Sequence, residues 1–348
     1  MFLTSSHRVA ILLHGGILGQ TGKTGLTLLR YSQAQIVAAI DRDCAGKNLF
    51  ELTGVAQDVP IVASVGEALV YQPNVLAIGI APSGGALPDD WVQEIEAAIA
   101  SGLSLVNGLH TFFGQKPALR QMLREGQWIW DVRQEPPGLG VGGGKARSLS
   151  CRRVLAVGTD MAIGKMSASI ELERCALRRG IRAKFLATGQ AGLMIAGDGV
   201  PLDAVRVDFA AGAIEKMVMQ FGPDQEILFI EGQGSLFHPG STATLPLLRG
   251  SQPTHLLLVH KVGQTAIKHC PDVKIPPLPE VIKLYEMVAN AAGTMERSRV
   301  AAIALNTGHL DETAAQDAIA QIQAETGLPC SDVVRFGADL LLDALISN

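Results

Sequence analysis

The sequence predicts an α/β protein made of two doubly wound parallel-sheet domains, and three observations support this prediction. Short apolar, β-branched segments alternate with helical patterns along the chain, as in parallel sheets with crossover helices. Residues 135–145, rich in glycine and proline, interrupt this alternation once. After the interruption, Gly158–Ser167 has the glycines, the lysine and the hydroxyl residue of a phosphate-binding loop.

The first domain is expected to span residues 1–137 and to be Rossmann-like. Its apolar segments predict strands at Arg8–Leu13, Gln35–Ile40, Pro60–Val62, Val75–Ile80, Leu103–Val106 and Trp128–Val132. The segments between them predict helices at Glu67–Tyr71, Pro88–Ala100 and Pro117–Arg124. This alternation is typical of a doubly wound sheet.

Residues 135–145 mark the predicted boundary, because glycine loses much entropy in regular structure and proline lacks a backbone donor. The second domain, residues 148–348, is expected to be P-loop NTPase-like. Its predicted strands are Arg153–Val157, Arg182–Thr188, Glu226–Ile230, His255–His260 and Arg299–Leu305. Its long helices are expected at Lys165–Arg179, Ala210–Gln220, Glu280–Ala292 and Asp311–Glu325.

The composition of the chain argues against nucleic acid and membrane as partners and favours a reducing compartment. The 348 residues carry a net charge of −4 and are 47% apolar, and no Lys/Arg cluster resembles a nucleic-acid patch. No apolar stretch reaches the roughly 20 residues that cross a bilayer. The five cysteines are scattered without a CxxC pair, which favours reduced thiols. We therefore expect a soluble, cytoplasmic protein that binds neither nucleic acid nor membrane.

The segment Gly158–Ser167 carries most of the functional prediction. A buried strand leads into a glycine-containing turn that opens a helix, so backbone N–H groups, the helix dipole and Lys165 can hold phosphate. Two features depart from the common pattern: five residues separate Gly158 from Gly164, and Met166 stands where a hydroxyl residue usually follows the lysine. The predicted phosphate-binding residues are Gly158, Thr159, Asp160, Ile163, Gly164, Lys165, Met166 and Ser167.

The five-residue spacing with Gly158-Thr-Asp160 resembles that of dethiobiotin synthetase and its relatives. Glu231, in the Glu-Gly-Gln-Gly segment after an apolar strand, then corresponds to a magnesium ligand, with Ser167 as the second ligand. Asn306 corresponds to an asparagine that contacts the purine base. By this resemblance residues 187–192 form another side of the site.

A closer resemblance covers nearly the whole chain. Its motifs are Lys23-Thr24, Ile40-Asp41 with Ala45–Lys47, Ala81–Gly85, Asn107–His110, Gly158–Met166 and Glu231–Gly234. Together they resemble a bacterial family long catalogued as a domain of unknown function, in which a Rossmann-like half precedes a P-loop half. Some members are assigned as D-glutamate N-acetyltransferases of the DgcN type. This resemblance implies acetyl-CoA as co-substrate and D-glutamate or a similar amino acid as acceptor.

Acetyl transfer to an amine needs a base and hydrogen-bond donors for the thioester oxyanion. In the predicted fold, the polar groups expected nearest the loop are Glu231 and His238, which are the candidate catalytic residues. The alternatives are a metal-binding glutamate and a surface histidine. Hydride transfer is not expected, because no Gly-x-Gly-x-x-Gly precedes Asp41.

Gly15–Thr24 has the same five-residue glycine spacing and also follows a strand. Gly25 weakens the helix that would follow, so a second phosphate loop and a flexible surface loop both remain open. Other polar segments end strands and are expected to line a cleft for a small substrate between the domains. The cleft residues are Ser83, Gly84, Gly85, Asn107, His110, Thr188, Gln190 and Gln233, and ordinary turn chemistry is the alternative for them.

Two other functions remain compatible with the sequence. An ATP- and Mg²⁺-dependent ligase or kinase would need Ser167 and Glu231 to reach the metal together. A non-catalytic nucleotide-binding switch would bind nucleotide without turnover. Met166 disfavours efficient magnesium chemistry, which places acetyl transfer first. In each case we expect a small-molecule ligand and a homo-oligomer.

Overall fold

The computed structural model describes residues 3–19, 21–81, 87–291 and 297–347. Contacts divide the chain into two compact units, each built around its own sheet. The first unit contains Met1–Gln134 and Gln190–Pro201, and the second contains Glu135–Gly189 and Leu202–Asn348. The segment Gln190–Pro201 therefore belongs by its contacts to the first unit, although its neighbours in sequence belong to the second.

The first unit has a six-stranded sheet in the order β3-β2-β1-β4-β5-β6, with every pair parallel. This is the strand order of a Rossmann fold. The strands are β1 (Arg8–Leu12), β2 (Gln35–Ile40), β3 (Ile61–Val62), β4 (Val75–Ile78), β5 (Ser104–Asn107) and β6 (Ile129–Asp131). The order reverses between β1 and β4, so the loops after these two strands lie at the position where such sheets bind ligands.

The helices of the first unit are α1 (Lys23–Tyr31), α2 (Leu49–Thr53), α3 (Val65–Ala68) with η1 (Leu69–Tyr71), α4 (Asp89–Ala100), α5 (Pro117–Met122) and α7 (Gln190–Ala196). They include three that the sequence did not predict, namely α1, α2 and α7. The expectation that Gly25 weakens a helix after the glycine loop is wrong, because Gly25 lies inside α1. A Cβ at this position would lie 2.6 Å from Cδ2 of Leu13, so glycine lets α1 pack closely on the first strand.

The second unit has another six-stranded parallel sheet, in the order β14-β13-β10-β7-β9-β8. Its strands are β7 (Arg152–Gly158), β8 (Ala183–Leu186), β9 (Ile227–Ile230), β10 (His255–Lys261), β13 (Arg299–Asn306) and β14 (Cys330–Ser331). A small antiparallel hairpin, β11 (Ala266–Ile267) and β12 (Cys270–Lys274), follows β10. Both sheets confirm the predicted fold class.

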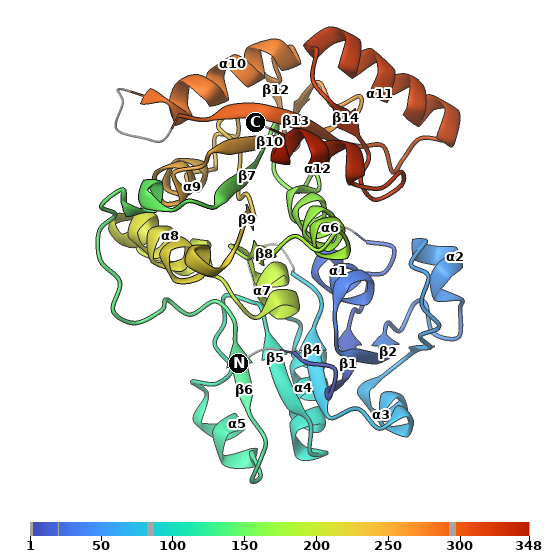
Figure 1. Ribbon diagram of the computed structural model, residues 1–348. Coiled ribbons are helices and arrows are strands. Elements are labelled where there is room, and N and C mark those ends of the chain that lie inside the picture. Colours follow the sequence, from blue (N-terminus) through green and yellow to red (C-terminus); the bar gives the residue numbers. More distant parts are fainter. Residues whose placement is uncertain (1–2, 20, 82–86, 292–296, 348) are drawn as a thin grey trace. The chain divides into compact units, whose positions relative to one another are not determined.

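The helices of the second unit pack on its sheet in pairs, with α6 against α12 and α8 against α9 (Figure 1). They are η2 (Lys145–Ser148), α6 (Lys165–Arg178), η3 (Leu202–Ala204), α8 (Val207–Phe221), η4 (Gly222–Asp224), α9 (Thr244–Ser251), α10 (Leu278–Ala289), α11 (Glu312–Thr326) and α12 (Asp339–Ile346). Val154 and Ala156 of β7 share one core cluster with Leu172 of α6 and Leu341 of α12. Strand alternation sends Leu155 and Val157 to the opposite face.

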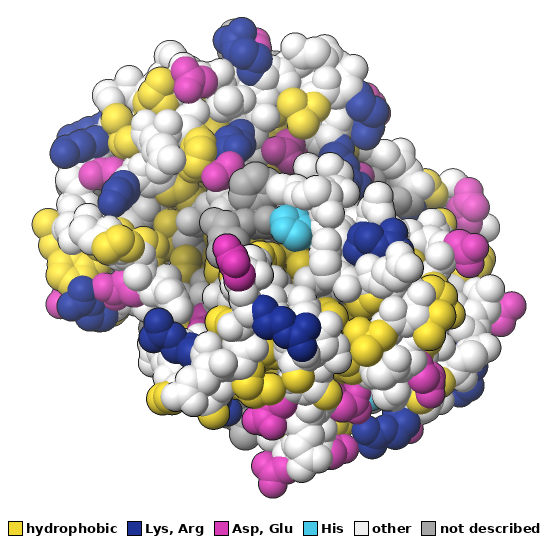
Figure 2. Space-filling view, turned by 90° about the horizontal axis from the view of Figure 1, so that it is seen from below, with side chains coloured by type: hydrophobic (Ala, Val, Ile, Leu, Met, Phe, Trp, Pro, Cys, Tyr) yellow, Lys and Arg dark blue, Asp and Glu magenta, His cyan; other side chains and the backbone are white. Residues whose placement is uncertain are grey.

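Among the described residues, no helix is long and apolar enough to cross a membrane. All five cysteines are free thiols. On the face seen in Figure 2, basic and acidic side chains are interspersed.

Candidate functional site

The loop between β7 and α6 occupies the carboxyl edge of the second sheet. In the sheet, β8 and β9 lie on one side of β7, whereas β10, β13 and β14 lie on its other side. The strand order therefore reverses between β7 and β10. Ligands of open α/β sheets bind at such a reversal. Gly164 caps α6 with φ 117°, a left-handed conformation that glycine adopts without strain. The loop therefore has the strand–turn–helix context that phosphate binding requires.

Lys165 lies beneath the loop, with only 6% of its surface exposed. Its Nζ donates a hydrogen bond of 2.6 Å to the carbonyl oxygen of Asp160. Its stem runs beside Gly232, where an added Cβ would lie 2.9 Å from Lys165 Cδ and would collide with the Ala156 carbonyl. A glycine directly after Glu231 is thus needed for the lysine to reach the loop.

Three side chains from later parts of the chain contact the loop, two of them at its backbone and one at a side chain. Tyr285 Oη donates to the Gly158 carbonyl at 2.7 Å, and Asn306 Nδ2 donates to the Ile163 carbonyl at 2.9 Å. Thr159, fully buried, pairs its hydroxyl with His260 Nδ1 at 2.9 Å. Burial lowers the pKa of His260 to about 4 and raises the pKa of Tyr285, so both groups are neutral near pH 7. The purine contact of Asn306 stays a prediction; its side chain supports the loop.

Asp160, at the start of the loop, is buried and hydrogen-bonded through both carboxylate oxygens. One carboxylate oxygen accepts a bond of 2.6 Å from its neighbour's amide, Met161 N–H. The other accepts bonds from Gln264 Nε2 and from Lys268 N–H, the latter at 2.7 Å. A buried carboxylate with these partners is satisfied within the protein. Asp160 therefore ties the β10–β11 segment to the phosphate loop.

The two residues after Lys165 differ in surroundings. Met166 is buried and belongs to the packed side of α6. Ser167 is half-buried, and its hydroxyl has no hydrogen-bond partner within the described part of the chain. The hydroxyl is thus free to contact a ligand or a hydrated ion, while Met166 is a packing residue.

Glu231 is a buried carboxylate at the end of β9. Its Oε2 accepts bonds from Thr188 N–H at 2.8 Å and from Gly189 N–H at 3.0 Å, and its Oε1 accepts a bond from Gln233 Nε2 at 3.1 Å. The Thr188 hydroxyl donates to the Glu231 carbonyl at 2.8 Å. Donors of this kind stabilise the ionised carboxylate. Both oxygens of Glu231 are therefore hydrogen-bonded within the protein, and Gly232, the next residue, lies beside the stem of Lys165.

His238 lies in the turn after Glu231. Its Nδ1 accepts a hydrogen bond of 3.0 Å from Gly240 N–H, so the neutral ring carries its proton on Nε2. A ring in this tautomer donates at Nε2 and does not accept there. The geometry therefore suits His238 as a donor to a ligand better than as a base.

The predicted cleft residues fall into separate groups. Asn107 is fully buried and bonds to Thr111, Asp131 and Leu109, which is turn chemistry. Thr188 and Gln233 both contact Glu231 in the second unit. Ser83, Gly84 and Gly85 lie outside the described residues.

His110 and Gln190 belong to a polar cluster in the first unit that the sequence reasoning did not recognise. Arg133 joins them: its Nη1 lies 2.6 Å from His110 Nε2, and its Nε donates to Gln190 Oε1 at 3.1 Å. Gln190 in turn donates to the Thr24 hydroxyl at 3.2 Å. Arg133 follows β6 by two residues, and its position after a strand end was the signal available in the sequence.

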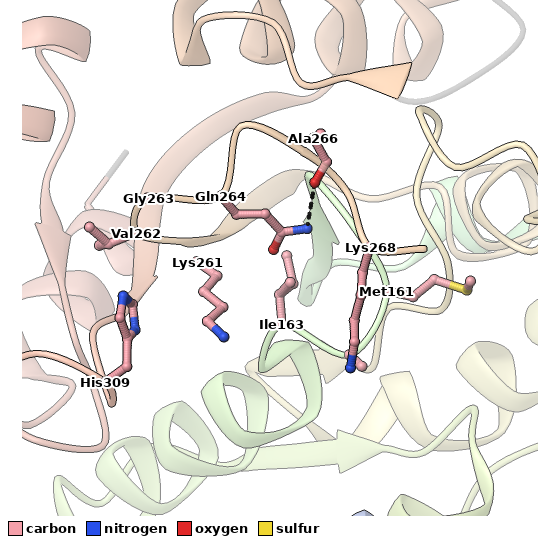
Figure 3. A pocket seen from close by; sticks show the side chains of 10 residues that line it. Met161, Ile163, Lys261, Val262, Gly263, Gln264, Ala266, Lys268 and His309 are labelled. Carbon is pink, nitrogen blue, oxygen red and sulfur yellow. Dashed lines mark hydrogen bonds between the residues drawn. The ribbon is translucent and has the colours of Figure 1, made fainter. Parts of the chain in front are cut away.

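Two pockets of the second unit meet at Met161, at the tip of the loop. The first, of about 460 Å³, is lined by the ends of β7, β10 and β13 (Figure 3). It contains Lys261, Lys268 and His309, none of which the sequence reasoning singled out. The second, of about 410 Å³, is lined by Gln233, Ser241 and residues near η3 and α9. One loop thus borders two cavities of ligand size.

Among the described residues, no group of three or more His, Cys, Asp or Glu side chains is placed to hold a metal ion. The predicted ligands Ser167 and Glu231 lie in the same unit, on α6 and at the end of β9. A magnesium role for these two residues stays a prediction.

Family models match both halves of the chain. Residues 140–342 match a P-loop domain of unknown function, DUF1611_C, and residues 42–135 match a Rossmann-like domain of unknown function, DUF1611_N. A crystal structure of a DUF1611 family protein from Anabaena variabilis is 64% identical in sequence. It superposes with a TM-score of 0.96 over 99% of this chain and 100% of that chain.

Two curated relatives bear the name D-glutamate N-acetyltransferase. The one from Tritonibacter scottomollicae is 38% identical over 80% of this chain and 83% of its own length. The one from a Pseudoalteromonas species is 34% identical over 80% of this chain and 83% of its own length.

Proposed function

The chain belongs to the DUF1611 family, and on this premise we propose that it is an N-acetyltransferase that moves acetyl from acetyl-CoA to D-glutamate or a similar amino acid. The observation that carries the proposal is the similarity, over 80% of the chain, to two relatives named D-glutamate N-acetyltransferase. The P-loop and its two flanking pockets supply a physical basis.

The phosphate loop suits the donor. Coenzyme A carries a pyrophosphate, which the loop amides, the start of α6 and Lys165 would hold without cleaving it. Such binding needs no metal-bound hydroxyl, which agrees with the burial of Met166 where P-loop enzymes usually have a hydroxyl residue. In this reading the loop is an anchor for the donor.

The transfer itself forms a bond between the amine nitrogen and the acetyl carbon and breaks the bond between that carbon and the CoA sulfur. We assign Glu231 as the group that accepts the amine proton, because it is a buried carboxylate whose following glycine packs on Lys165. His238 Nε2–H would donate to the oxygen of the tetrahedral intermediate. The CoA thiolate leaves as the product forms.

One observation favours a second candidate, an ATP- and Mg²⁺-dependent ligase or kinase. The hydroxyl of Ser167 is without a partner in the described residues, and a hydroxyl near this position commonly binds Mg²⁺ in P-loop enzymes. This candidate requires ATP binding that depends on magnesium. A non-catalytic switch would bind nucleotide with no product.

The decisive experiment follows free CoA thiol and the acetylated product by mass spectrometry, with acetyl-CoA and a panel of D- and L-amino acids. We expect CoA release only with an acceptor amine, fastest with D-glutamate or a close analogue. Lys165→Ala should abolish it, while Lys283→Ala, an exposed lysine on α10, should not. Absence of product with every acceptor, together with Mg²⁺-dependent ATP binding, would instead support the ligase or the switch.

The role of Glu231 is tested separately with Glu231→Gln, which keeps the side-chain shape and one carbonyl oxygen. We expect kcat to fall roughly 100-fold, the usual effect of losing a general base, with little change in the KM for acetyl-CoA. An unchanged kcat would remove Glu231 from the proton transfer without touching the assignment of the reaction.

A further inference from the structure

The pocket in Figure 3 lies where the strand order of the second sheet reverses. Segments that follow three neighbouring strands form its walls: Met161–Ile163 after β7, Lys261–Lys268 at and after β10, and His309 after β13. Met161 and Ile163 belong to the phosphate loop itself. A ligand whose phosphates rest on the loop would therefore extend into this pocket.

Positive charge is concentrated in the pocket. Lys261 and Lys268 are both exposed, and neither ammonium group has an acidic partner in the described ranges of the chain. In Figure 3, Lys261 and His309 lie on one side of Ile163, and Lys268 lies on the other. The buried carboxylate of Asp160 is occupied by Met161 N–H, Gln264 and Lys268 N–H. The two ammonium groups are thus left for an anion from outside.

The remaining wall suits a flat, mostly apolar group. Met161, Ile163 and Val262 supply apolar surface, and Gln264 is held by Asp160 and by the Ala266 carbonyl at 3.1 Å. The volume of about 460 Å³ is in the range of pockets that hold small ligands. The two lysines suit a phosphate group and the apolar wall suits a base, so the pocket has the chemistry to bind a phosphorylated nucleoside.

We propose that this pocket binds the adenosine end of CoA, with the 3′-phosphate of the ribose ion-paired to Lys261 and Lys268. The inference rests on the proposed function, because CoA is the ligand that the acetyl donor supplies. The 5′-pyrophosphate would bind to the phosphate loop, and the ribose 3′-phosphate would bind to Lys261 and Lys268. ATP has no 3′-phosphate, so this contact would let a P-loop protein prefer CoA over ATP.

The test compares CoA with 3′-dephospho-CoA by calorimetric titration of the full chain. We expect CoA to bind at least roughly 10-fold more tightly, the range of one or two charge-assisted hydrogen bonds. Lys261→Met and Lys268→Met should each reduce this preference, and the double variant should abolish it. The affinity for 3′-dephospho-CoA should stay unchanged in all three. Lys283→Met, which removes an exposed lysine outside the pocket, is the matched control.

Each other outcome overturns a defined part of the proposal. Equal affinities for the two ligands in the natural sequence would overturn the 3′-phosphate site and leave acetyl transfer standing. A preference that survives the double variant would place the 3′-phosphate elsewhere. Failure to bind either ligand, with no CoA release in the acetyl-transfer assay, would overturn the proposed function together with this site.

Discussion

Two glycine loops of this protein share a pattern but not a structure. Gly15–Gly22 follows β1 in the first unit, and Gly158–Gly164 follows β7 in the second; each precedes a helix that begins with a lysine. Both lie where the strand order of their sheet reverses. Yet Lys23 is exposed, whereas Lys165 is 6% exposed and bonded under its loop.

In the first loop, a carboxylate of the protein itself accepts hydrogen bonds from the backbone amides. Asp41, 1% exposed, accepts hydrogen bonds from Gly15 N–H at 3.2 Å and from Ile17 N–H at 3.1 Å. Gly16 and Gly22 touch: a Cβ at Gly16 would lie 2.9 Å from the Cα of Gly22. An internal carboxylate already takes amides that a phosphate would need.

The second loop also contains a buried carboxylate, but Asp160 accepts from one loop amide, Met161 N–H, and its other oxygen is bonded to Gln264 and Lys268 N–H. A pocket opens in front of Met161–Ile163. The difference teaches that glycine spacing alone does not identify a phosphate site. What decides is whether the amides are still available after the chain has folded.

The largest expected effect is a difference in CoA affinity between variants of Lys165 and Lys23, the lysines that follow the two loops. Lys165→Ala should lower the affinity for CoA roughly 100-fold, because a buried ammonium beside the loop is lost. Lys23→Ala should change it less than about 2-fold, since this lysine is exposed in the other unit. Calorimetric titration of both variants checks the contrast. A similar loss in both would mean that the first loop also contacts the ligand.

The carboxylate of the first loop should matter for stability. Asp41→Ala leaves the amides of Gly15 and Ile17 without their acceptor, which should lower the free energy of unfolding by about 2–4 kcal/mol. Asp41→Asn keeps one acceptor oxygen and should lose about half as much. All three tryptophans, at positions 91, 128 and 130, lie in the first unit, so urea unfolding followed by their fluorescence reports on it.

CoA affinity should be unchanged in both Asp41 variants. A gain of phosphate binding in Asp41→Ala would show that only the internal carboxylate keeps the first loop from acting as an anion site.

A smaller effect is expected where the second loop begins. Tyr285→Phe removes the hydroxyl that donates to the Gly158 carbonyl and accepts from Leu236 N–H, which should cost the second unit about 1–2 kcal/mol. Far-UV circular dichroism in urea measures this loss. Tyr71→Phe, a change at an exposed ring of the first unit, is the control and should have no effect. Equal stability of the two variants would mean that the Gly158 anchor is dispensable.

The smallest effect is a pH dependence of the second unit. The folded pKa of His260 is about 4, below its usual 6.5, so between these values the unfolded chain binds more protons and stability falls as pH falls. From about pH 7.5 to about pH 6 its share of this loss should be about 1 kcal/mol. His255, whose pKa burial also lowers to about 4, adds a similar share.

Urea titrations at several pH values check this prediction. His260→Asn should remove roughly half of the decline, and His255→Gln a similar part. A decline that is unchanged in both variants would assign it to other groups.

Much of the fold was predictable from local patterns. The strands of the two large sheets, except the two-residue β14, were placed to within a few residues, because buried β-branched runs bounded by turns are a local signal. The missed helices have other causes. α1 contains Gly25, whose packing role appears only when the first strand lies against it, and α7 owes its place to contacts with α1. The hairpin β11–β12 is short and has exposed residues, so no periodicity marks it.

By itself the sequence determined the two α/β halves, the phosphate loop and the family, since these depend on residue type and spacing along the chain. Only the tertiary structure decided which loop remains open. Asp41 and Gly15 are 26 residues apart, and Tyr285 and Gly158 are 127 apart, so their hydrogen bonds exist only after packing. The convergence of Lys261, Lys268 and His309 was likewise decided by neighbouring strand ends. The physical reason is that burial and partner choice, which set the availability of a polar group, are properties of the packed chain.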